Sequence, residues 1–508
     1  MEPPEETTAS EETPAPPVGG SLSRQAGIVI VARGVAFFVA FVVPVVLVRV
    51  IDQQQYGHYR QAVFLLAVFY PILQFGTTQS LFYFYPREPA RRRALVTQTV
   101  GFLAATSVVF AVLLVAARGL VGAYFNDAEM TRLAPLIGPY VGLMVLTSVL
   151  DVLPVVQQKM RLAFAVILSS ETLRAALLVT AAVATRDVRV LVAALVVFAA
   201  ARAAFMLVLL RVQGLLGTGD LGTRFVGKQL AYSVPFGLAG TVVTLIQMSD
   251  RLYVSRYFDA SQFAIYSVGC YQLPLIMIVF QSAASVMLGR MAALQAADQV
   301  GEMLALLRNA VRKLSLVALP AVAVAIVLGR DLITVVYTGD YAAATPIFMV
   351  FLALIPRSAT AYGTVTRAYG LTRWIFQLSL WALVVAVVLV FALTPRLGLV
   401  GPALAVVVAL WVVAGGQIWK SARLLGCGLR GLYPWGELGR IAAVAAVPAV
   451  GLAFVRAHVE APPAVHLLAG GGVYALIVGV LALRLGLVRP AEWAAARAEL
   501  RRRLGGAP

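Results

Sequence analysis

Charged residues are unusually scarce in this sequence. Only 13% of its 508 residues are Asp, Glu, Lys or Arg, whereas 61% are hydrophobic, and the mean hydropathy is +0.88. A soluble domain is about a quarter charged, and one core could not hide this much apolar surface from water. The composition excludes a soluble globular protein. It predicts an all-α, polytopic membrane protein whose excess apolar surface faces lipid.

Residues and motifs that carry chemistry are also few. The two cysteines, Cys270 and Cys427, lack metal-ligand spacing, and the sequence has no metal-ligand cluster, no Walker-type phosphate loop and no GxSxG motif. The glycine-rich stretch 214–219 follows a membrane helix instead of a buried strand, so we interpret it as a flexible linker. The sequence therefore predicts neither an enzyme nor a bound cofactor or metal, and ATP is not expected to be the direct energy source.

Acidic residues are outnumbered, with 23 Asp and Glu against 41 Lys and Arg and a net charge of +18. The basic residues fall in short clusters between apolar stretches and not along one polar face, which argues against a nucleic-acid partner. Alternate loops carry most of them, so the positive-inside rule places both termini in the cytoplasm. The intervening loops are short, which weighs against membrane glycosyltransferases and O-antigen ligases.

About fourteen stretches are apolar enough to cross a bilayer, which needs about twenty apolar residues per helix. They are 25–50, 61–85, 94–117, 133–157, 162–184, 188–210, 229–258, 262–289, 314–328, 345–366, 374–393, 399–419, 441–455 and 467–488. The first 22 residues are rich in Pro, Thr and Glu and lack the basic start of a signal peptide. We expect them to form a disordered cytoplasmic tail without a cleaved leader.

An internal repeat divides these helices. The segment Arg49–Tyr59 and the segment Arg256–Tyr266 share Arg, Asp, Gln, an aromatic residue and Tyr at one constant offset, and Gln74 matches Gln281 at the same offset. An even number of helices separates the equivalent positions, so the repeats are parallel and related by an axis along the membrane normal. The sequence predicts an N-lobe (23–214), a linker (215–228), a C-lobe (229–425), two further helices (426–489) and a basic tail (490–508).

Short motifs give this layout a family resemblance. Tyr56-Gly57-His58-Tyr59 resembles the "YGxY" that follows the first helix of polysaccharide-biosynthesis flippases, and 76–86 is similar to the end of their second helix. These flippases belong to the MOP superfamily, which also contains the MATE exporters. The resemblance implies two six-helix lobes, two extra helices and a transporter. We expect Gln74 and Gln281 to bond across the lobe interface.

Ionisable residues at bilayer depth mark a pathway or an ion pair. Six fall well inside predicted spans: Arg33, Asp151, Glu171, Arg174, Arg202 and Arg357. Glu171 and Arg174 are three residues apart and can neutralise each other. Asp151 can pair with Arg33 or with Arg202, and Arg33 can also extend its side chain to the inner surface. Arg357 and Arg202 have no acid nearby in the sequence, so we expect both to face a central cavity.

Four arginines against two carboxylates favour an anionic cargo, because the guanidinium group binds phosphate bidentately. We predict a cationic substrate site formed by Arg33, Arg174, Arg202 and Arg357. Asp151 or Glu171 would supply an ion-coupling site if one exists. The expected function is the flipping of polyprenyl-pyrophosphate-linked oligosaccharides across the inner membrane, as in O-antigen or lipopolysaccharide synthesis.

The cargo would pass between glycosyltransferases and a polysaccharide polymerase, with membrane lipids as the other partners. Three alternatives remain: a MATE-type drug or cation antiporter, a peptidoglycan-precursor (lipid II) flippase, and a polytopic glycosyltransferase or ligase.

Overall fold

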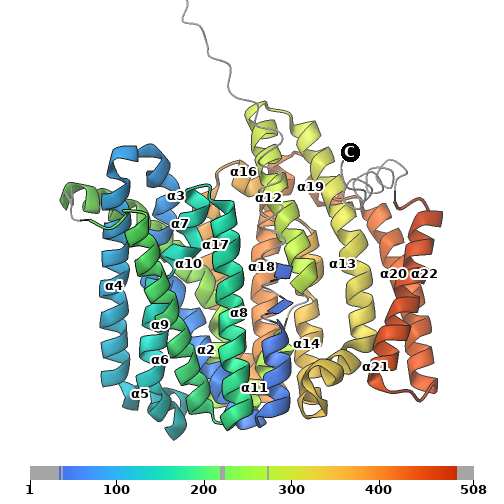
Figure 1. The fold of residues 1–508 in the computed structure, drawn as a ribbon. Coiled ribbons are helices and arrows are strands. Elements are labelled where there is room, and N and C mark those ends of the chain that lie inside the picture. The colour runs from blue at the N-terminus through green and yellow to red at the C-terminus, as the bar shows by residue number, and fades with distance from the viewer. Residues whose placement is uncertain (1–33, 36–37, 40, 218–222, 272–273, 489–508) are drawn as a thin grey trace, which may run out of the picture.

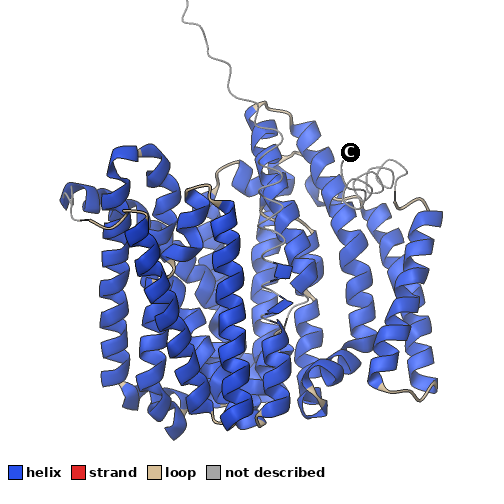
Figure 2. Cartoon of the chain, in the orientation of Figure 1, coloured by secondary structure: helices blue, strands red, loops and turns tan. Residues whose placement is uncertain are grey.

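The computed structural model describes residues 34–35, 38–39, 41–217, 223–271 and 274–488, and every regular element within these ranges is helical (Figure 2). A first helix, Phe41–Val50, precedes the labelled elements. The first half of the molecule then contains α2 (Gln53–Gln74), α3 (Thr77–Arg87), η1 (Pro89–Arg91), α4 (Arg92–Ala116), α5 (Arg118–Phe125), α6 (Ala128–Leu146), α7 (Val149–Val156), α8 (Met160–Thr185) and α9 (Val188–Val212).

The second half contains α10 (Thr223–Tyr257), α11 (Ala260–Gly269), α12 (Pro274–Ala296), α13 (Val300–Tyr337), η2 (Gly339–Ala344), α14 (Thr345–Leu352), α15 (Leu354–Ala359), α16 (Thr364–Ala368), α17 (Thr372–Leu397) and α18 (Val400–Leu424). The chain closes with α19 (Gly428–Leu432), α20 (Trp435–His458), α21 (Pro463–Val465), η3 (His466–Gly470) and α22 (Gly471–Arg484).

Within the described residues, 11 helices are long and apolar enough to cross a membrane, or 12 if α2 and α3, bent by 42°, form one span. The prediction of an all-α, multi-pass membrane protein is confirmed. The two remaining expected spans, 25–50 and 262–289, cross positions outside the described residues. The count of fourteen therefore stays a prediction.

The helices run between two ends of the bundle. Figure 1 places α3, α7, α16 and α19 at one end and α5, α11 and α21 at the other. The first of these ends, below called the basic end, carries the arginine-rich turn between α3 and α4. The helix α13 has 38 residues, or about 57 Å at 1.5 Å per residue, which exceeds the ~30 Å of a hydrocarbon core. It extends well beyond the expected 314–328, and Figure 1 shows α12 and α13 rising above their neighbours at the basic end.

Two repeated aspartates set where helices begin. Asp52 accepts a hydrogen bond from the backbone N–H of Gln55 (2.8 Å), and Asp259 accepts one from Gln262 at the same distance. Both are N-caps, which favour helix initiation directly after them. The helices α2 and α11 therefore start at Gln53 and Ala260, earlier than the expected 61 and 262. Asp52 and Asp259, which the sequence repeat makes equivalent, have the same capping role in each half.

The two halves pack closely through small residues. The helix α2 packs against α11 and α10. A methyl group on Gly57 would lie 1.9 Å from the carbonyl oxygen of Ala260, and one on Gly237 would lie 2.4 Å from the backbone of Phe75. Only glycine allows such close backbone approach. The two glycines hold α2 and its continuation against the second half along their length.

The last two long helices, α20 and α22, pack against α13. Arg456 on α20 binds Asp331 on α13 through two hydrogen bonds of 2.5 and 3.2 Å. The C-terminal helices are thus attached to the second half by a bidentate ion pair and an aliphatic cluster.

Candidate functional site

Arg202 on α9 forms an ion pair with Asp151 on α7. The other carboxylate oxygen of Asp151 accepts a hydrogen bond from the Tyr70 hydroxyl at 2.9 Å. The Arg202 side chain is 9% exposed and that of Asp151 is 43% exposed. Of the alternatives open from the sequence, the structure shows the pairing of Asp151 with Arg202. Arg202 is not an unpaired cation in this conformation.

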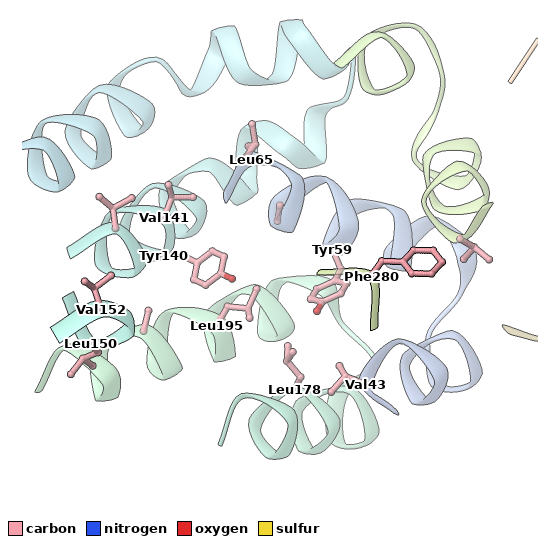
Figure 3. Packing of buried hydrophobic residues seen from close by; sticks show 14 of the residues in the cluster. Val43, Tyr59, Leu65, Tyr140, Val141, Leu150, Val152, Leu178, Leu195 and Phe280 are labelled. Carbon is pink, nitrogen blue, oxygen red and sulfur yellow. The ribbon is translucent and has the colours of Figure 1, made fainter. Parts of the chain in front are cut away.

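Arg174 on α8 contacts Glu171 one turn earlier, and its Nε donates to Glu171 Oε2 at 3.1 Å. Two tyrosines, Tyr59 and Tyr140, lie near enough to be affected by the charges of this pair. Figure 3 shows both rings among buried aliphatic side chains of the first half. The acidic and basic groups of this polar network balance each other, which is how buried charges are tolerated.

The expected glutamine bond across the lobe interface is not tested. Gln74 is buried, and its side-chain oxygen accepts a hydrogen bond from the Thr78 hydroxyl at 2.7 Å, at the bend between α2 and α3. Gln281 lies in α12, and its side chain falls outside the described residues, as does all of Arg33. Gln74 therefore has a local role at the bend, and a role at the interface remains a prediction.

Arg357 on α15 has no acidic partner among the described residues. Its Nη1 donates to the backbone oxygen of Leu410 at 3.1 Å, and its guanidinium carbon lies 4.7 Å from the centre of the Tyr362 ring. It lines a cavity of about 510 Å³ together with Gln247, Tyr362 and Arg367. We call this the arginine cavity. It joins α10, α12, α15 and α16 and presents two guanidinium groups, which suits an anion.

Arg60 is a partly buried cation that the sequence interpretation missed. Its Nε is buried and has no hydrogen-bond partner among the described residues. Four tyrosines from both halves lie near its charge: Tyr56, Tyr59, Tyr271 and Tyr337. The expected span began at position 61 and left Arg60 in a loop. The cap at Asp52, with Gln three residues later, was the available signal that the helix starts earlier.

Asp250 on α10 is a buried carboxylate, only 1% exposed. Its Oδ2 accepts a hydrogen bond from the Tyr266 hydroxyl at 2.7 Å, while Oδ1 has no partner among the described atoms. The adjacent Arg251 donates to Met248 Sδ at 3.5 Å. Asp250 is therefore a buried carboxylate that is hydrogen-bonded through one oxygen only among the described atoms.

The charges that remain after pairing are mostly positive. Asp151, Glu171 and Asp331 each form a salt bridge. In contrast, Arg60 and Arg357 contact no carboxylate among the described residues, and the buried Asp250 forms no salt bridge with a described basic residue. An unpaired cation inside a membrane protein is costly unless it faces a pathway or a ligand.

Hydrogen bonds join the halves at both ends. Away from the basic end, Arg49 donates to the backbone oxygens of Val335 (2.6 Å) and Val336 (2.7 Å) on α13. Near the basic end, the Gln229 amide donates to the hydroxyls of Ser80 and Thr99, each at 2.9 Å. The two halves are thus joined by hydrogen bonds near each end of the bundle, and these bonds must break before the halves can move apart there.

An apolar groove of about 740 Å³ runs between α13 and α22. Its lining is aliphatic apart from Tyr474, whose hydroxyl donates to the backbone oxygens of Pro320 (3.2 Å) and Ala445 (3.0 Å) and is therefore satisfied. The groove offers a long apolar surface with no free polar side chain in its described lining.

Comparisons with known proteins agree with this architecture. No curated protein matches the sequence. Among solved structures, the lipid II flippase MurJ in an inward closed conformation superposes with a TM-score of 0.68 at 11% identity, covering 89% of this chain and 99% of that one. An inward-facing multidrug resistance MATE family transporter of the MOP superfamily gives 0.55 at 12% identity, covering 80% and 96%.

A MOP superfamily transporter from Pyrococcus furiosus, described as having a binding pocket of reverse polarity, gives a TM-score of 0.56 at 12% identity, covering 80% of this chain and 95% of that chain. At these identities the likeness shows the fold alone. The family described as "Polysaccharide biosynthesis protein" matches residues 46–346, which include helices of both halves. The chain therefore belongs to the polysaccharide biosynthesis protein family and has the fold of the MOP superfamily transporters.

Proposed function

We propose that the protein is a flippase that moves polyprenyl-pyrophosphate-linked oligosaccharides from the cytoplasmic to the outer leaflet of a bacterial inner membrane. The observation that carries the proposal is the sign of the unpaired charge. Arg60 and Arg357 lack carboxylate partners, and Arg367 lines the same cavity as Arg357. A pyrophosphate supplies the acceptor oxygens that these guanidinium groups lack.

The apolar groove between α13 and α22 supports a lipid-linked cargo. A polyprenyl chain has no hydrogen-bonding groups, and the aliphatic groove lining leaves no polar group that would need a hydrogen-bond partner. The head group would occupy the space between the halves while the chain stays in the groove or in the bilayer.

Closure at both ends supports alternating access. Opening at the basic end, the cytoplasmic end in the proposed orientation, requires loss of the bonds between Gln229 and the two hydroxyls. Opening at the other end requires release of Arg49 from α13. Arg174 and Arg202 would join the cargo site only if their pairs with Glu171 and Asp151 open, which would also free these carboxylates for ion coupling.

A MATE-type cation antiporter is favoured less, because Asp151 and Glu171 are paired with arginines in this conformation. Asp250 forms no salt bridge with a described basic residue, but it is only 1% exposed and is bonded to Tyr266. A lipid II flippase would use the same charges and groove, so only the cargo separates it from the proposal. Transport of defined lipid-linked sugars decides between them.

The test uses the purified chain in vesicles with a labelled polyprenyl-pyrophosphate oligosaccharide. We expect Arg60→Ala and Arg357→Ala each to slow transport about tenfold or more, the cost of one charge-assisted hydrogen bond. Arg396→Ala, which removes an exposed arginine at the end of α17, is the matched control. Normal transport in both Arg60→Ala and Arg357→Ala would contradict the anion site. Equal or faster transport of lipid II would move the cargo assignment to peptidoglycan precursors.

A further inference from the structure

A second groove lies between α10 and α17, outside the features assigned above. It has a volume of about 550 Å³, and one wall residue, Tyr124, comes from α5 of the first half. None of the arginines proposed to bind cargo lines it. We call it the α10–α17 groove.

The lining changes in character along the groove. Both helices run away from the basic end, so Leu245 on α10 and Leu383 on α17 lie near mid-bundle. Further along come Tyr253, Tyr257 and Phe391, whose rings pack together at centroid distances of 4.5 to 6.3 Å. The groove is thus aliphatic in the middle of the bundle and aromatic at its end. Tyrosines are enriched at the membrane–water interface, where their hydroxyls reach water.

The length of the groove corresponds to one leaflet. From Leu245 to Tyr257 the helix rises about 18 Å, close to the ~15 Å of half a hydrocarbon core. The helices α10 and α17 pack directly against each other, and the groove follows their contact. An acyl chain fits along an apolar groove of this length.

A cation lies at the aromatic end. Arg256 donates through Nη1 to the backbone oxygens of Ala123 (3.1 Å) and Tyr124 (3.3 Å). Its described bonds leave the N–H groups of Nε and Nη2 available, since a guanidinium has five donors. We propose that the α10–α17 groove binds an anionic phospholipid of the leaflet opposite the basic end, with its phosphate at Arg256 and one acyl chain along the aliphatic wall.

The bound lipid would span the junction of the halves. The Tyr124 hydroxyl donates to the backbone oxygen of Leu252 at 2.8 Å, which attaches α5 to α10 at the groove. The groove is complete only while this contact persists. The lipid therefore binds more tightly to the conformation closed at this end.

The experiment uses the full chain in nanodiscs with photoactivatable phosphatidylglycerol that carries a diazirine in its acyl chain. We expect crosslinks in peptides covering 245–257 and 383–391. Val387→Trp places an indole in the groove and should lower this labelling about tenfold, equivalent to ~1.4 kcal/mol. Val388→Trp is the control, because Val388 is on the same helix, 59% exposed, and does not line the groove.

Arg256→Gln should lower labelling by phosphatidylglycerol but not by a matched phosphatidylcholine probe. If Val387→Trp unfolds at a lower temperature than the control, Leu245→Trp replaces it, because this substitution places an indole in the groove from α10 instead of α17. Equal labelling of the variant with tryptophan in the groove and of Val388→Trp overturns the proposal. Displacement of the probe by an equimolar amount of polyprenyl-pyrophosphate lipid also overturns it, because the occupant would then be the cargo.

Discussion

The two halves of the molecule treat their membrane charges differently. In the first half, Arg174 and Arg202 each form a neutral pair with a carboxylate, while Arg60, on the helix α2 that packs against the second half, does not. In the second half, Arg357 and Arg367 line one cavity without an acidic neighbour among the described lining residues. Neutral pairs hold helices together, whereas an uncompensated cation is available to a ligand. The comparison suggests a scaffold in one half and a cargo contact in the other, with Arg60 at their junction.

The largest difference between the halves is expected in the free energy of unfolding when one member of a first-half ion pair is removed. Asp151→Ala would leave Arg202 uncompensated at 9% exposure. Loss of one partner of a buried pair costs about 3–5 kcal/mol, and the 43% exposure of Asp151 reduces this to about 2–4 kcal/mol. Arg357→Ala removes an unpaired charge and should cost less than about 1 kcal/mol.

Denaturant unfolding of the protein in detergent measures both free energies. The double variant Asp151→Ala with Arg202→Leu should recover most of the lost stability, because no charge remains unpaired. If Asp151→Ala is as stable as Arg357→Ala, the pair is not a scaffold and the contrast between the halves disappears.

Transport rates also distinguish the ion pair of the first half from the unpaired Arg357 of the second half. Exchanging the pair, as Asp151→Arg with Arg202→Asp, keeps a neutral contact and should retain about half or more of the transport rate. Arg357→Glu reverses the charge of the arginine cavity and should lower the rate more than about tenfold. The measurement is initial uptake of labelled lipid-linked oligosaccharide at equal protein levels. The reverse ranking would make Arg202 the cargo ligand, as the sequence alone suggested.

Hydropathy predicted how deep these residues lie but not which way they face. The periodic apolar stretches located most helices, and the repeat located Asp52 and Asp259 in equivalent positions. The pairing of Arg202 with Asp151 depends on the rotation of α9 against α7, which no local pattern encodes. Arg60 was missed for a different reason, because a polar helix cap of Asp and Gln looks like a loop on a hydropathy scale.

The packing of the C-terminal helices was also beyond the sequence interpretation. The predicted span 441–455 contains no acid, and Arg456 next to it was assigned to a loop. Its partner Asp331 belongs to the extended α13, whose predicted end was Leu328. Helix ends are set by caps and tertiary contacts as much as by apolar length.

Voltage is the next test, with an expected effect of severalfold on the rate. A pyrophosphate head group carries about two negative charges, and one charge crossing 100 mV is worth ~2.3 kcal/mol. Outward movement of this head group is favoured when the cytoplasmic side is negative. If Arg60 and Arg357 neutralise the cargo, the empty carrier returns with these charges uncompensated, and the potential draws them inward. Either way, transport should accelerate as the cytoplasmic side becomes more negative.

Potassium and valinomycin set the potential in reconstituted vesicles, with equal pH and sodium on both sides. Arg357→Ala should weaken the voltage dependence, whereas the exchanged Asp151–Arg202 pair should not, since its net charge is unchanged. A rate that ignores voltage and follows a proton or sodium gradient would instead direct attention to Asp151 and Glu171.

The smallest expected effect concerns a feature in which the halves should agree. Asp52 and Asp259 cap α2 and α11 through the same hydrogen bond of 2.8 Å to the third residue of the helix. In α11 the Gln262 side chain also accepts from the Asp259 backbone N–H at 3.2 Å, whereas in α2 the Gln55 amide donates to the Asp52 carboxylate at 3.0 Å.

Replacing an N-cap by Ala costs about 1 kcal/mol. We therefore expect Asp52→Ala and Asp259→Ala to lower the free energy of unfolding by equal amounts, within a few tenths of a kcal/mol. Asp→Asn at each site, which keeps a capping oxygen, should cost less. A loss confined to one of the two sites would mean that the repeated residues share a sequence but not a structural role.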